Sequence, residues 1–239
     1  MSGAIRKRGL AALAAATVVA LAGCGAAGER VEDGGSTGGE DAVLSVAATT
    51  NFIADTVRAV GGDRVAVTGL MGPGVDPHLY KASAGDVATL RDADAVFYGG
   101  LFLEGKMAEV LDELSEQVPT VAVSEAIPEE ELLDPPAGAA PEEEHDPHVW
   151  FDPSLWAHSV EAIRDQLSEL DPEGAAEYER NADALLAEMD DLQRAGEERL
   201  GAIPERQRVL ITSHDAFEYF GRAFGLDVHA IQGLSTADE

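Results

Sequence analysis

From residue 43 onwards, short runs rich in β-branched and other apolar residues alternate with stretches in which apolar residues recur every three or four positions. The runs are typical of buried strands, and the recurring positions are typical of amphipathic helices. Because strands that alternate with helices form right-handed βαβ units, we expect a mostly parallel sheet covered by helices on both faces. In the first half of the chain the pattern predicts strands at 43–48, 65–70, 95–98 and 120–123, and helices at 52–60, 83–91 and 104–116.

Two longer helices are predicted next. The first spans residues 154–170, and Asp171-Pro172-Glu173 is typical of the start of the second, which runs to about Leu200. The second helix would be about 45 Å long, which suits a connection between two lobes, although a short coiled coil is the alternative. It carries one apolar stripe, made of Tyr178, Ala182, Leu185, Met189 and Leu192.

A shorter β/α series follows Pro204, with strands predicted at 209–212 and 228–231 and a helix at 215–224. A parallel sheet needs cover on both faces, which two strands and one helix cannot provide. The sequence therefore predicts an α/β fold with two lobes, the second of which is incomplete in this chain and continues in a longer protein. The expected boundaries are 42–171 for the first lobe, 172–201 for the linking helix and 202–239 for the start of the second lobe.

Residues 1–41 are predicted to lie outside the fold. Basic residues at 6–8 precede an apolar run at 10–22 that is too short to span a bilayer comfortably. The run ends in Leu21-Ala22-Gly23-Cys24, which resembles a bacterial lipobox, in which the cysteine is lipidated and becomes the first mature residue. We predict a lipoprotein signal peptide at 1–23, lipid on Cys24 and a flexible tether at 24–41, with an ordinary secretory signal as the alternative.

The charge balance narrows the choice of partners. The chain has 16 Lys and Arg against 45 Asp and Glu, a formal net charge of −29. A nucleic-acid-binding surface needs a basic footprint, so the composition excludes DNA and RNA as partners. Cys24 is the only cysteine, which excludes an intrachain disulfide and a thiolate metal site.

Three histidines share one kind of position in the predicted chain. His78 and His148 each end an Asp-Pro-His tripeptide, His214 ends Thr-Ser-His, and each precedes a predicted helix. Proline restrains its own φ and pushes the preceding residue toward extended backbone, so each Asp-Pro-His is a stiff loop that holds an imidazole in one direction. Loops at the carboxyl ends of parallel strands line one crevice, so the three side chains can converge there. Because imidazole binds zinc and other first-row metals, the pattern predicts a metal site.

Any one of these histidines taken alone is more often an ordinary surface or core residue than a ligand, so the prediction depends on all three. The remaining histidines lack the context: His145 lies in an acidic stretch, His158 inside a predicted helix and His229 beside a late strand. The acidic stretch, residues 125–146, is either a solvated surface loop or a loop that gathers cations, since it leads directly into His148.

Three aspartates adjoin the candidate ligands: Asp76, Asp146 and Asp215. A carboxylate beside a ligand imidazole often accepts its second N–H and fixes its tautomer. The alternative is that these aspartates serve as turn or capping residues.

At these motifs the chain resembles the lipoprotein metal-binding receptors of zinc and manganese ABC transporters, the cluster A-I (TroA-like) solute-binding proteins of periplasmic solute-binding protein family 9. The resemblance extends from Val43 to Glu239. It is carried by the segments MGPGVDPHLY (71–80), HDPHVWFDP (145–153), TSHDAF (212–217) and QGLST (232–236).

This resemblance implies two α/β lobes joined by one long helix, with the metal held in the cleft. It implies that His78, His148 and His214 are the first, second and third metal ligands. The family's fourth ligand is usually an Asp in the second lobe, which we expect to lie beyond residue 239, because Asp238 and Glu239 come too early. Family members with Glu as the third ligand are mostly manganese receptors, so His214 indicates Zn²⁺, or both Zn²⁺ and Mn²⁺, as the bound cargo.

The implied function is that of a non-catalytic receptor, a monomer held by lipid at the outer face of the bacterial cell membrane, that captures the metal and passes it to an ABC transporter permease. A surface adhesin lipoprotein is one alternative. A zinc-dependent hydrolase is another, because three histidines with an open fourth position also describe a catalytic zinc site. Against the hydrolase, the sequence has no HExxH motif and no nucleophile elbow. Because the ligands must be neutral, metal binding is expected to weaken as the pH falls through the histidine range near 6.5.

Overall fold

Strands and helices alternate through the two parts of the chain that the computed structural model describes, residues 42–135 and 139–231. The predicted signal peptide, Cys24 and the tether lie outside these residues, as does the segment 232–239. All the described residues belong to one compact unit. No helix among them combines the length and the apolar character needed to cross a bilayer.

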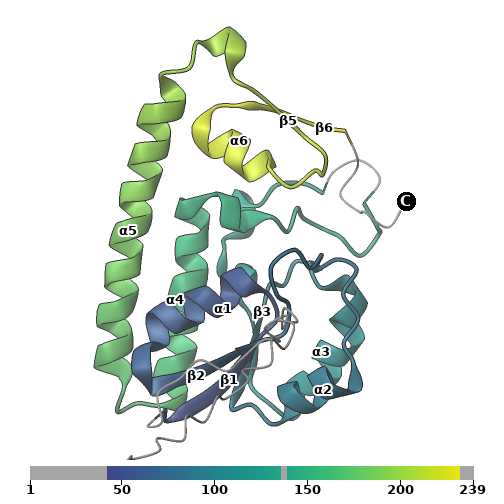
Figure 1. The fold of residues 1–239 in the computed structure, drawn as a ribbon, viewed down its shortest axis with the longest axis vertical. Helices are drawn as coiled ribbons and strands as arrows, with labels where there is room; N and C mark the ends of the chain where they lie inside the picture. The colour runs from purple at the N-terminus through teal and green to yellow at the C-terminus, as the bar shows by residue number, and fades with distance from the viewer. Residues whose placement is uncertain (1–41, 136–138, 232–239) are drawn as a thin grey trace, which may run out of the picture. The chain divides into compact units, whose positions relative to one another are not determined.

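Four parallel strands form the larger sheet, in the order β2-β1-β3-β4 (Figure 1). They span Leu44–Ala48 (β1), Val65–Gly69 (β2), Ala95–Tyr98 (β3) and Thr120–Ala122 (β4). Within β1, Val46 belongs to one hydrophobic core and Ala47 to another, because successive side chains of a strand point to opposite faces. Both residues are almost fully buried, which is typical of a parallel sheet between two layers of helices.

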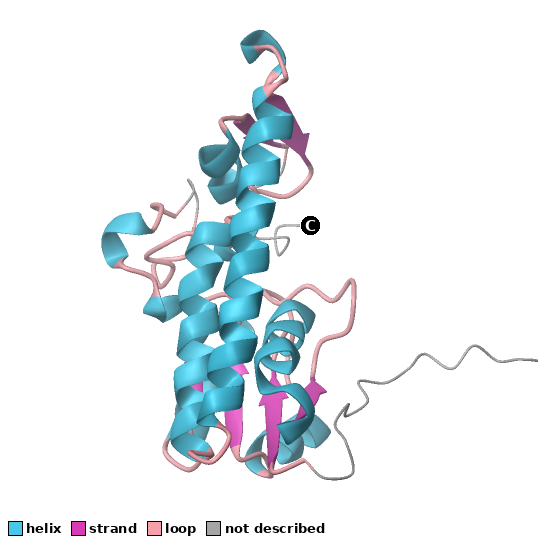
Figure 2. Ribbon diagram, turned by 90° about the vertical axis from the view of Figure 1, so that its left-hand side faces the viewer, coloured by secondary structure: helices cyan, strands magenta, loops and turns pink. Residues whose placement is uncertain are grey.

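Helices cover both faces of this sheet (Figures 1 and 2). They span Asn51–Gly61 (α1), Ala84–Arg91 (α2), Ala108–Ser115 (α3), Pro153–Leu170 (α4) and Ala175–Gly201 (α5). Side chains of α1, α4 and α5 pack with Val46 and Phe97 in the larger core, and side chains of α2 and α3 pack with Ala47 and Val96 in the other. The arrangement confirms the predicted α/β fold.

Two helix starts follow local signals in the sequence. Ser83 caps α2, as predicted, in a capping box with Asp86, each side chain accepting a hydrogen bond from the other residue's backbone N–H. At the start of α4 the side chain of Asp152 accepts from the backbone of Ser154, and Pro153 occupies the first helical position. This fixes where α4 begins, shortly after His148.

The long helix α5 begins at Ala175, later than the sequence predicts. Asp171, the expected cap, instead accepts hydrogen bonds of 2.7 Å from Arg64 and Tyr178, which join the start of α5 to the segment that follows α1. The apolar stripe of α5 packs inward at its start, where Tyr178 and Ala182 are fully buried, whereas Leu192 is 60% exposed. The first part of the stripe therefore serves packing within the chain.

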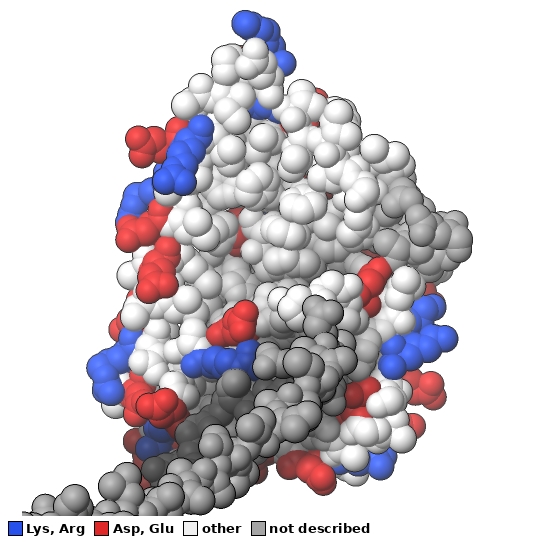
Figure 3. All heavy atoms as spheres, in the orientation of Figure 1, with Lys and Arg blue, Asp and Glu red and all other residues white. Residues whose placement is uncertain are grey.

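A second, two-stranded parallel sheet follows α5, formed by β5 (Val209–Thr212) and β6 (Asp227–Ala230) with α6 (Glu218–Phe224) between them. The predicted helix at 215–224 is shortened because the chain bends at residues 213–215, and the Ala216 N–H donates to the carbonyl of His214. One side of this sheet is open: Val209 is 47% exposed and Ile211 66% exposed. Figure 3 shows few charged side chains over this part of the molecule.

The predicted helix at 104–116 begins later than expected. Gly100, Leu101 and Phe102 all have positive φ angles, so the backbone makes a left-handed turn before a short 3₁₀ segment and α3. Glu104 points inward there and accepts hydrogen bonds from the Thr49 hydroxyl (2.6 Å) and the Gly99 N–H (2.8 Å). A buried carboxyl group thus stands at the carboxyl ends of β1 and β3.

Candidate metal centre

The two Asp-Pro-His loops present their histidines in the same way. The backbone N–H of His78 donates to the side chain of Asp76 (2.9 Å), and that of His148 donates to Asp146 (3.0 Å). Each aspartate therefore closes a turn around the proline and fixes the direction of the imidazole that follows. His214 reaches the same place from the second sheet, shortly after the end of β5.

The three imidazoles meet through their Nε2 atoms. His148 Nε2 lies 3.2 Å from His78 Nε2 and 3.3 Å from His214 Nε2, and the candidate ligand atoms of all three residues lie within 4.8 Å of one another. A tetrahedral zinc ion with Zn–N distances of about 2.0–2.1 Å holds its ligand nitrogens about 3.3–3.4 Å apart. Two of the three spacings therefore match those that a shared metal ion requires.

His148 is the most deeply buried of the three, and a carboxylate holds its ring. Its Nδ1 lies 2.8 Å from Asp146 Oδ1, and both side chains are 2% exposed. A carboxylate can only accept, so Nδ1 carries the proton and the lone pair of Nε2 faces the other two rings. Asp146 thus fills both of the roles that the sequence left open, turn residue and imidazole orienter.

The surroundings of His78 favour its neutral imidazole. Burial lowers the pKa of His78 to about 4, and a positive charge on His148 acts in the same direction, whereas Asp76 opposes the shift. Burial also raises the pKa of Asp215, and the charge of Asp146 adds to this effect. Because neutral imidazole is the form that binds metal, His78 is ready to do so throughout the neutral pH range.

Other residues singled out in the sequence take different places. Among the described residues, the only group of three or more side chains with metal-ligand spacing is His78, His148 and His214. His229 pairs with Asp227 (3.1 Å), and neither His145 nor His158 belongs to the group. Asp76 forms the turn described above, and the buried Oδ1 of Asp215 accepts no hydrogen bond.

Two residues beside the centre were not identified from the sequence. The ring of Trp150 lies 5.3 Å from that of His148 and stacks on Phe52 at 4.3 Å. The hydroxyl of Tyr219, in α6, donates to the backbone carbonyl of Asp146 (2.8 Å) and accepts from the N–H of Leu133 (2.9 Å). Trp150 lies inside a recognised motif and could have been noted, but nothing local marks Tyr219.

Comparison with known proteins gives one consistent result. The family model for ZnuA, described as zinc-uptake complex component A, periplasmic, matches residues 46–239. The manganese-binding lipoprotein MntA of Bacillus subtilis is 45% identical over 230 residues, which cover 96% of this chain and 72% of the relative. The zinc-binding protein TroA of Treponema pallidum is 45% identical over 194 residues, 81% of this chain and 61% of the relative.

Solved structures agree with the sequence relatives. The solved structure described as the periplasmic zinc-binding protein TroA from Treponema pallidum aligns with a TM-score of 0.77 and 44% identity, covering 82% of this chain and 69% of that chain. The chain therefore spans roughly two thirds of the length of the proteins that it matches.

Proposed function

Since the chain belongs to the ZnuA family of periplasmic zinc-uptake components, we propose that it captures Zn²⁺ or Mn²⁺ outside the cell membrane and delivers the ion to an ABC transporter permease. Relatives carry names that state manganese binding and zinc binding, and another is named as an iron ABC transporter substrate-binding lipoprotein. The family resemblance of the motifs is thereby confirmed. The family consists of substrate-binding proteins, and we propose for this chain a receptor without catalytic activity.

The observation that carries the proposal is the convergence of three histidines from distant parts of the chain. We assign His78, His148 and His214 as the metal ligands because the Nε2 atom of His148 lies at the spacing of a shared ion from the Nε2 atoms of both other residues. The site is suited to direct ligation of a cation, because Asp146 already orients the ring of His148 in the metal-free protein.

The test is metal binding by single variants. We expect the protein to bind one Zn²⁺ per chain, and His78→Ala, His148→Ala and His214→Ala each to weaken binding by at least about 100-fold, because each removes one inner ligand. His229→Ala is the matched control, since His229 is exposed and outside the group. Competition titration against a chromophoric chelator gives the affinities, and full affinity in any two of the three ligand variants would refute the assignment.

The choice between zinc and manganese needs a separate measurement. Zn²⁺ exceeds Mn²⁺ in affinity at almost any site of nitrogen and oxygen ligands, so tight zinc binding in vitro does not identify the cargo. The cargo can be identified by growing cells with both metals, purifying the protein and measuring which metal it contains. We expect zinc to predominate because all three proposed ligands are imidazoles, the ligand type that zinc favours over manganese.

We further propose that the protein is extracytoplasmic and anchored through lipid on Cys24. The support is the lipobox-like Leu21-Ala22-Gly23-Cys24 and the fact that two relatives are named as lipoproteins. Metabolic labelling with a radioactive fatty acid is expected to mark the native protein and not Cys24→Ser. Equal labelling of both would rule out Cys24 as the lipid site.

A further inference from the structure

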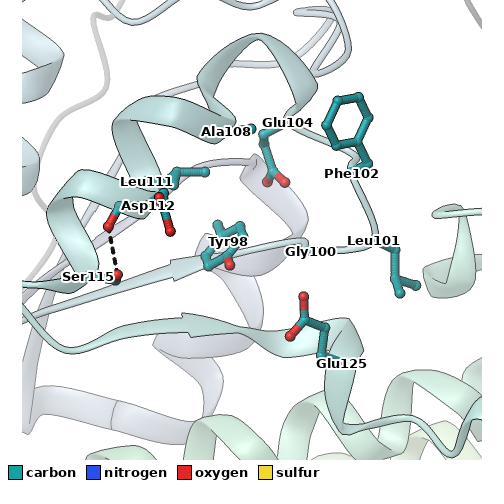
Figure 4. A pocket seen from close by; sticks show the side chains of 10 residues that line it. All are labelled: Tyr98, Gly100, Leu101, Phe102, Glu104, Ala108, Leu111, Asp112, Ser115 and Glu125. Atoms are coloured by element: carbon teal, nitrogen blue, oxygen red, sulfur yellow. Dashed lines mark hydrogen bonds between the residues drawn. The ribbon is translucent and has the colours of Figure 1, made fainter. Parts of the chain in front are cut away.

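A cavity of about 320 Å³, lined by none of the three clustered histidines, lies between the carboxyl ends of β3 and β4 and the helix α3 (Figure 4). It is bordered by both polar and apolar side chains, and none of the residues that line it is basic. Figure 4 shows the carboxyl groups of Glu104, Asp112 and Glu125 directed toward the side of the cavity where Tyr98 lies. The proposed metal-binding function uses none of these groups.

Glu104 distinguishes this cavity from an ordinary acidic surface. Its side chain is 2% exposed, and its Oε1 accepts hydrogen bonds from Thr49 (2.6 Å) and Gly99 (2.8 Å). Its Oε2 is equally buried and accepts no hydrogen bond of normal geometry, although the backbone N–H groups of Gly100 and Glu104 lie close enough to the carboxyl group to favour its ionised form. A buried carboxyl oxygen without a partner carries a large desolvation cost, and a donor that enters the cavity would remove that cost.

The backbone around Glu104 takes a conformation that few residues with side chains adopt. Leu101 and Phe102 have φ angles of 51° and 64°, in the left-handed region that residues with side chains rarely occupy. A Cβ atom at Gly99 would lie 3.1–3.2 Å from the Glu104 carboxyl oxygens, and one at Gly100 would lie 2.9 Å from Ala122. Such strain persists where the surrounding structure enforces it, and it gathers at binding sites.

The carboxyl groups are too far apart to form a ready cage for a bare metal ion. Among the described residues, the histidine cluster is the only group of three ligating side chains within 4.8 Å of one another. The polar end of the cavity therefore suits a larger cation with several N–H donors spread around it. Its apolar wall, which includes Ala108 and Leu111, suits a short aliphatic chain.

We propose that this cavity binds an organic cation, an alkylguanidinium or alkylammonium group, whose charged head donates to Oε2 of Glu104 and whose aliphatic stem lies against Leu111. Glu125 and Asp112, both exposed, add negative charge along the border and attract the cation. Burial raises the pKa of Glu104, and bound cationic donors would favour its ionised form again. The same chemistry is offered by a small free amine and by an arginine or lysine side chain of a protein.

The test uses n-butylguanidinium, with n-butylurea as the neutral analogue, at about 0.15 M NaCl so that diffuse attraction to the acidic surface is screened. We expect saturable binding of the cation alone, mapped by NMR to residues 98–115. Glu104→Gln should weaken it at least about tenfold, because the variant removes the charge that receives the guanidinium. The amide oxygen can still accept from Thr49 and Gly99, so this variant is expected to fold.

Two further variants separate the effect of charge at the border of the cavity from that of charge elsewhere on the surface. Glu125→Gln, on the exposed border, should weaken binding about threefold without affecting the fold. Glu109→Gln removes an equal charge from the exposed side of α3, outside the cavity, and should leave binding unchanged. Binding that is unchanged in Glu104→Gln, or equal loss in Glu109→Gln, would overturn the proposal, as would the absence of saturable binding. Zinc affinity is expected to be the same in all three variants, so this result is independent of the metal site.

A final pair of ligands separates the two sources of the cation. Nα-acetylarginine amide carries the same head group on a peptide-like backbone. If it binds as well as n-butylguanidinium, the cavity admits a protein side chain, and if only the simple cation binds, the ligand is a small molecule. Both results support recognition of the guanidinium head, whereas binding of n-butylurea with equal affinity would contradict it.

Discussion

Tyr219 donates a hydrogen bond of 2.8 Å to the backbone carbonyl of Asp146, the residue whose side chain holds His148. Tyr219 belongs to α6, between the two strands of the small sheet, and its side chain is fully buried. The same hydroxyl accepts from the N–H of Leu133. One phenol group thus links the element that follows His214 with the loop that presents His148.

Tyr219→Phe is therefore expected to weaken zinc binding about three- to tenfold, less than the 10–100-fold typical of a group that contacts a ligand directly. It should also lower the free energy of unfolding by about 1–2 kcal/mol, because the buried carbonyl of Asp146 and the partly buried N–H of Leu133 lose their partner. Chelator competition and chemical denaturation measure the two effects.

Tyr178→Phe provides the matched control for Tyr219→Phe. Tyr178 is equally buried and donates to Asp171 (2.7 Å), at the start of α5. We expect a similar loss of stability and no change in zinc affinity. If both variants lowered zinc affinity alike, the effect of Tyr219 would reflect general loosening of the fold and not its link to Asp146.

The sequence predicts best those features that depend on neighbouring residues. The strands at 95–98 and 209–212 are observed with the predicted bounds because each is a short apolar run with clear ends. Ser83 starts α2 because its capping box involves only the first turn of the helix. The three histidines could be grouped because proline restrains the loops of His78 and His148, and because all three precede a predicted helix.

Features that depend on distant contacts were missed or misplaced. Glu104 was expected to start a helix, but its partner Thr49 lies 55 positions away and draws it inward. Asp171 was expected as a cap, but Arg64, 107 positions away, engages its carboxylate instead. Neither contact leaves a pattern in the local sequence, because each is made only when the strands and helices have packed.

Asp146→Asn is expected to lower zinc affinity about 10–100-fold while the loop keeps its shape. The amide oxygen can still accept from the backbone N–H of His148, which preserves the turn. The lost charge makes the imidazole a weaker ligand and leaves its tautomer less firmly fixed. Asp55→Asn, an exposed carboxylate in α1, is the control that should have no effect. Retention of wild-type affinity in Asp146→Asn would mean that the carboxylate serves the turn alone.

The pH dependence of the metal-free protein is predicted from His78, whose pKa is lowered from 6.5 to about 4. Between these values the unfolded chain binds a proton at this residue and the folded chain does not, so stability falls as the pH drops from about 6.5 to about 4. Above 6.5 His78 adds no pH dependence. The contribution amounts to about 2–3 kcal/mol by pH 4.5.

His78→Gln is expected to remove that part of the pH dependence. The difference in unfolding free energy between pH 7 and pH 4.5 should therefore be smaller in the variant than in the native chain. His229→Gln, which changes an exposed histidine, should leave the difference as it is. An NMR titration gives a direct check: a midpoint for the His78 ring near 6.5 would show that burial does not control its charge. Protons would then compete with the metal for His78 near pH 6.5, as the sequence predicts.

Trp150 offers an optical signal of metal binding, because its ring lies 5.3 Å from that of His148. The chain has two tryptophans, and the other, Trp156, is buried in α4 with its indole N–H donating to Thr56. We expect zinc to change the intrinsic fluorescence, most of this change to vanish in Trp150→Phe and most of it to remain in Trp156→Phe. Phe52 stacks on Trp150 and can pack against phenylalanine as well, so the Trp150 variant should bind zinc within about threefold of the native affinity. A fluorescence change that follows Trp156 instead would place the metal-induced rearrangement in the core beneath α4 and not at the histidines.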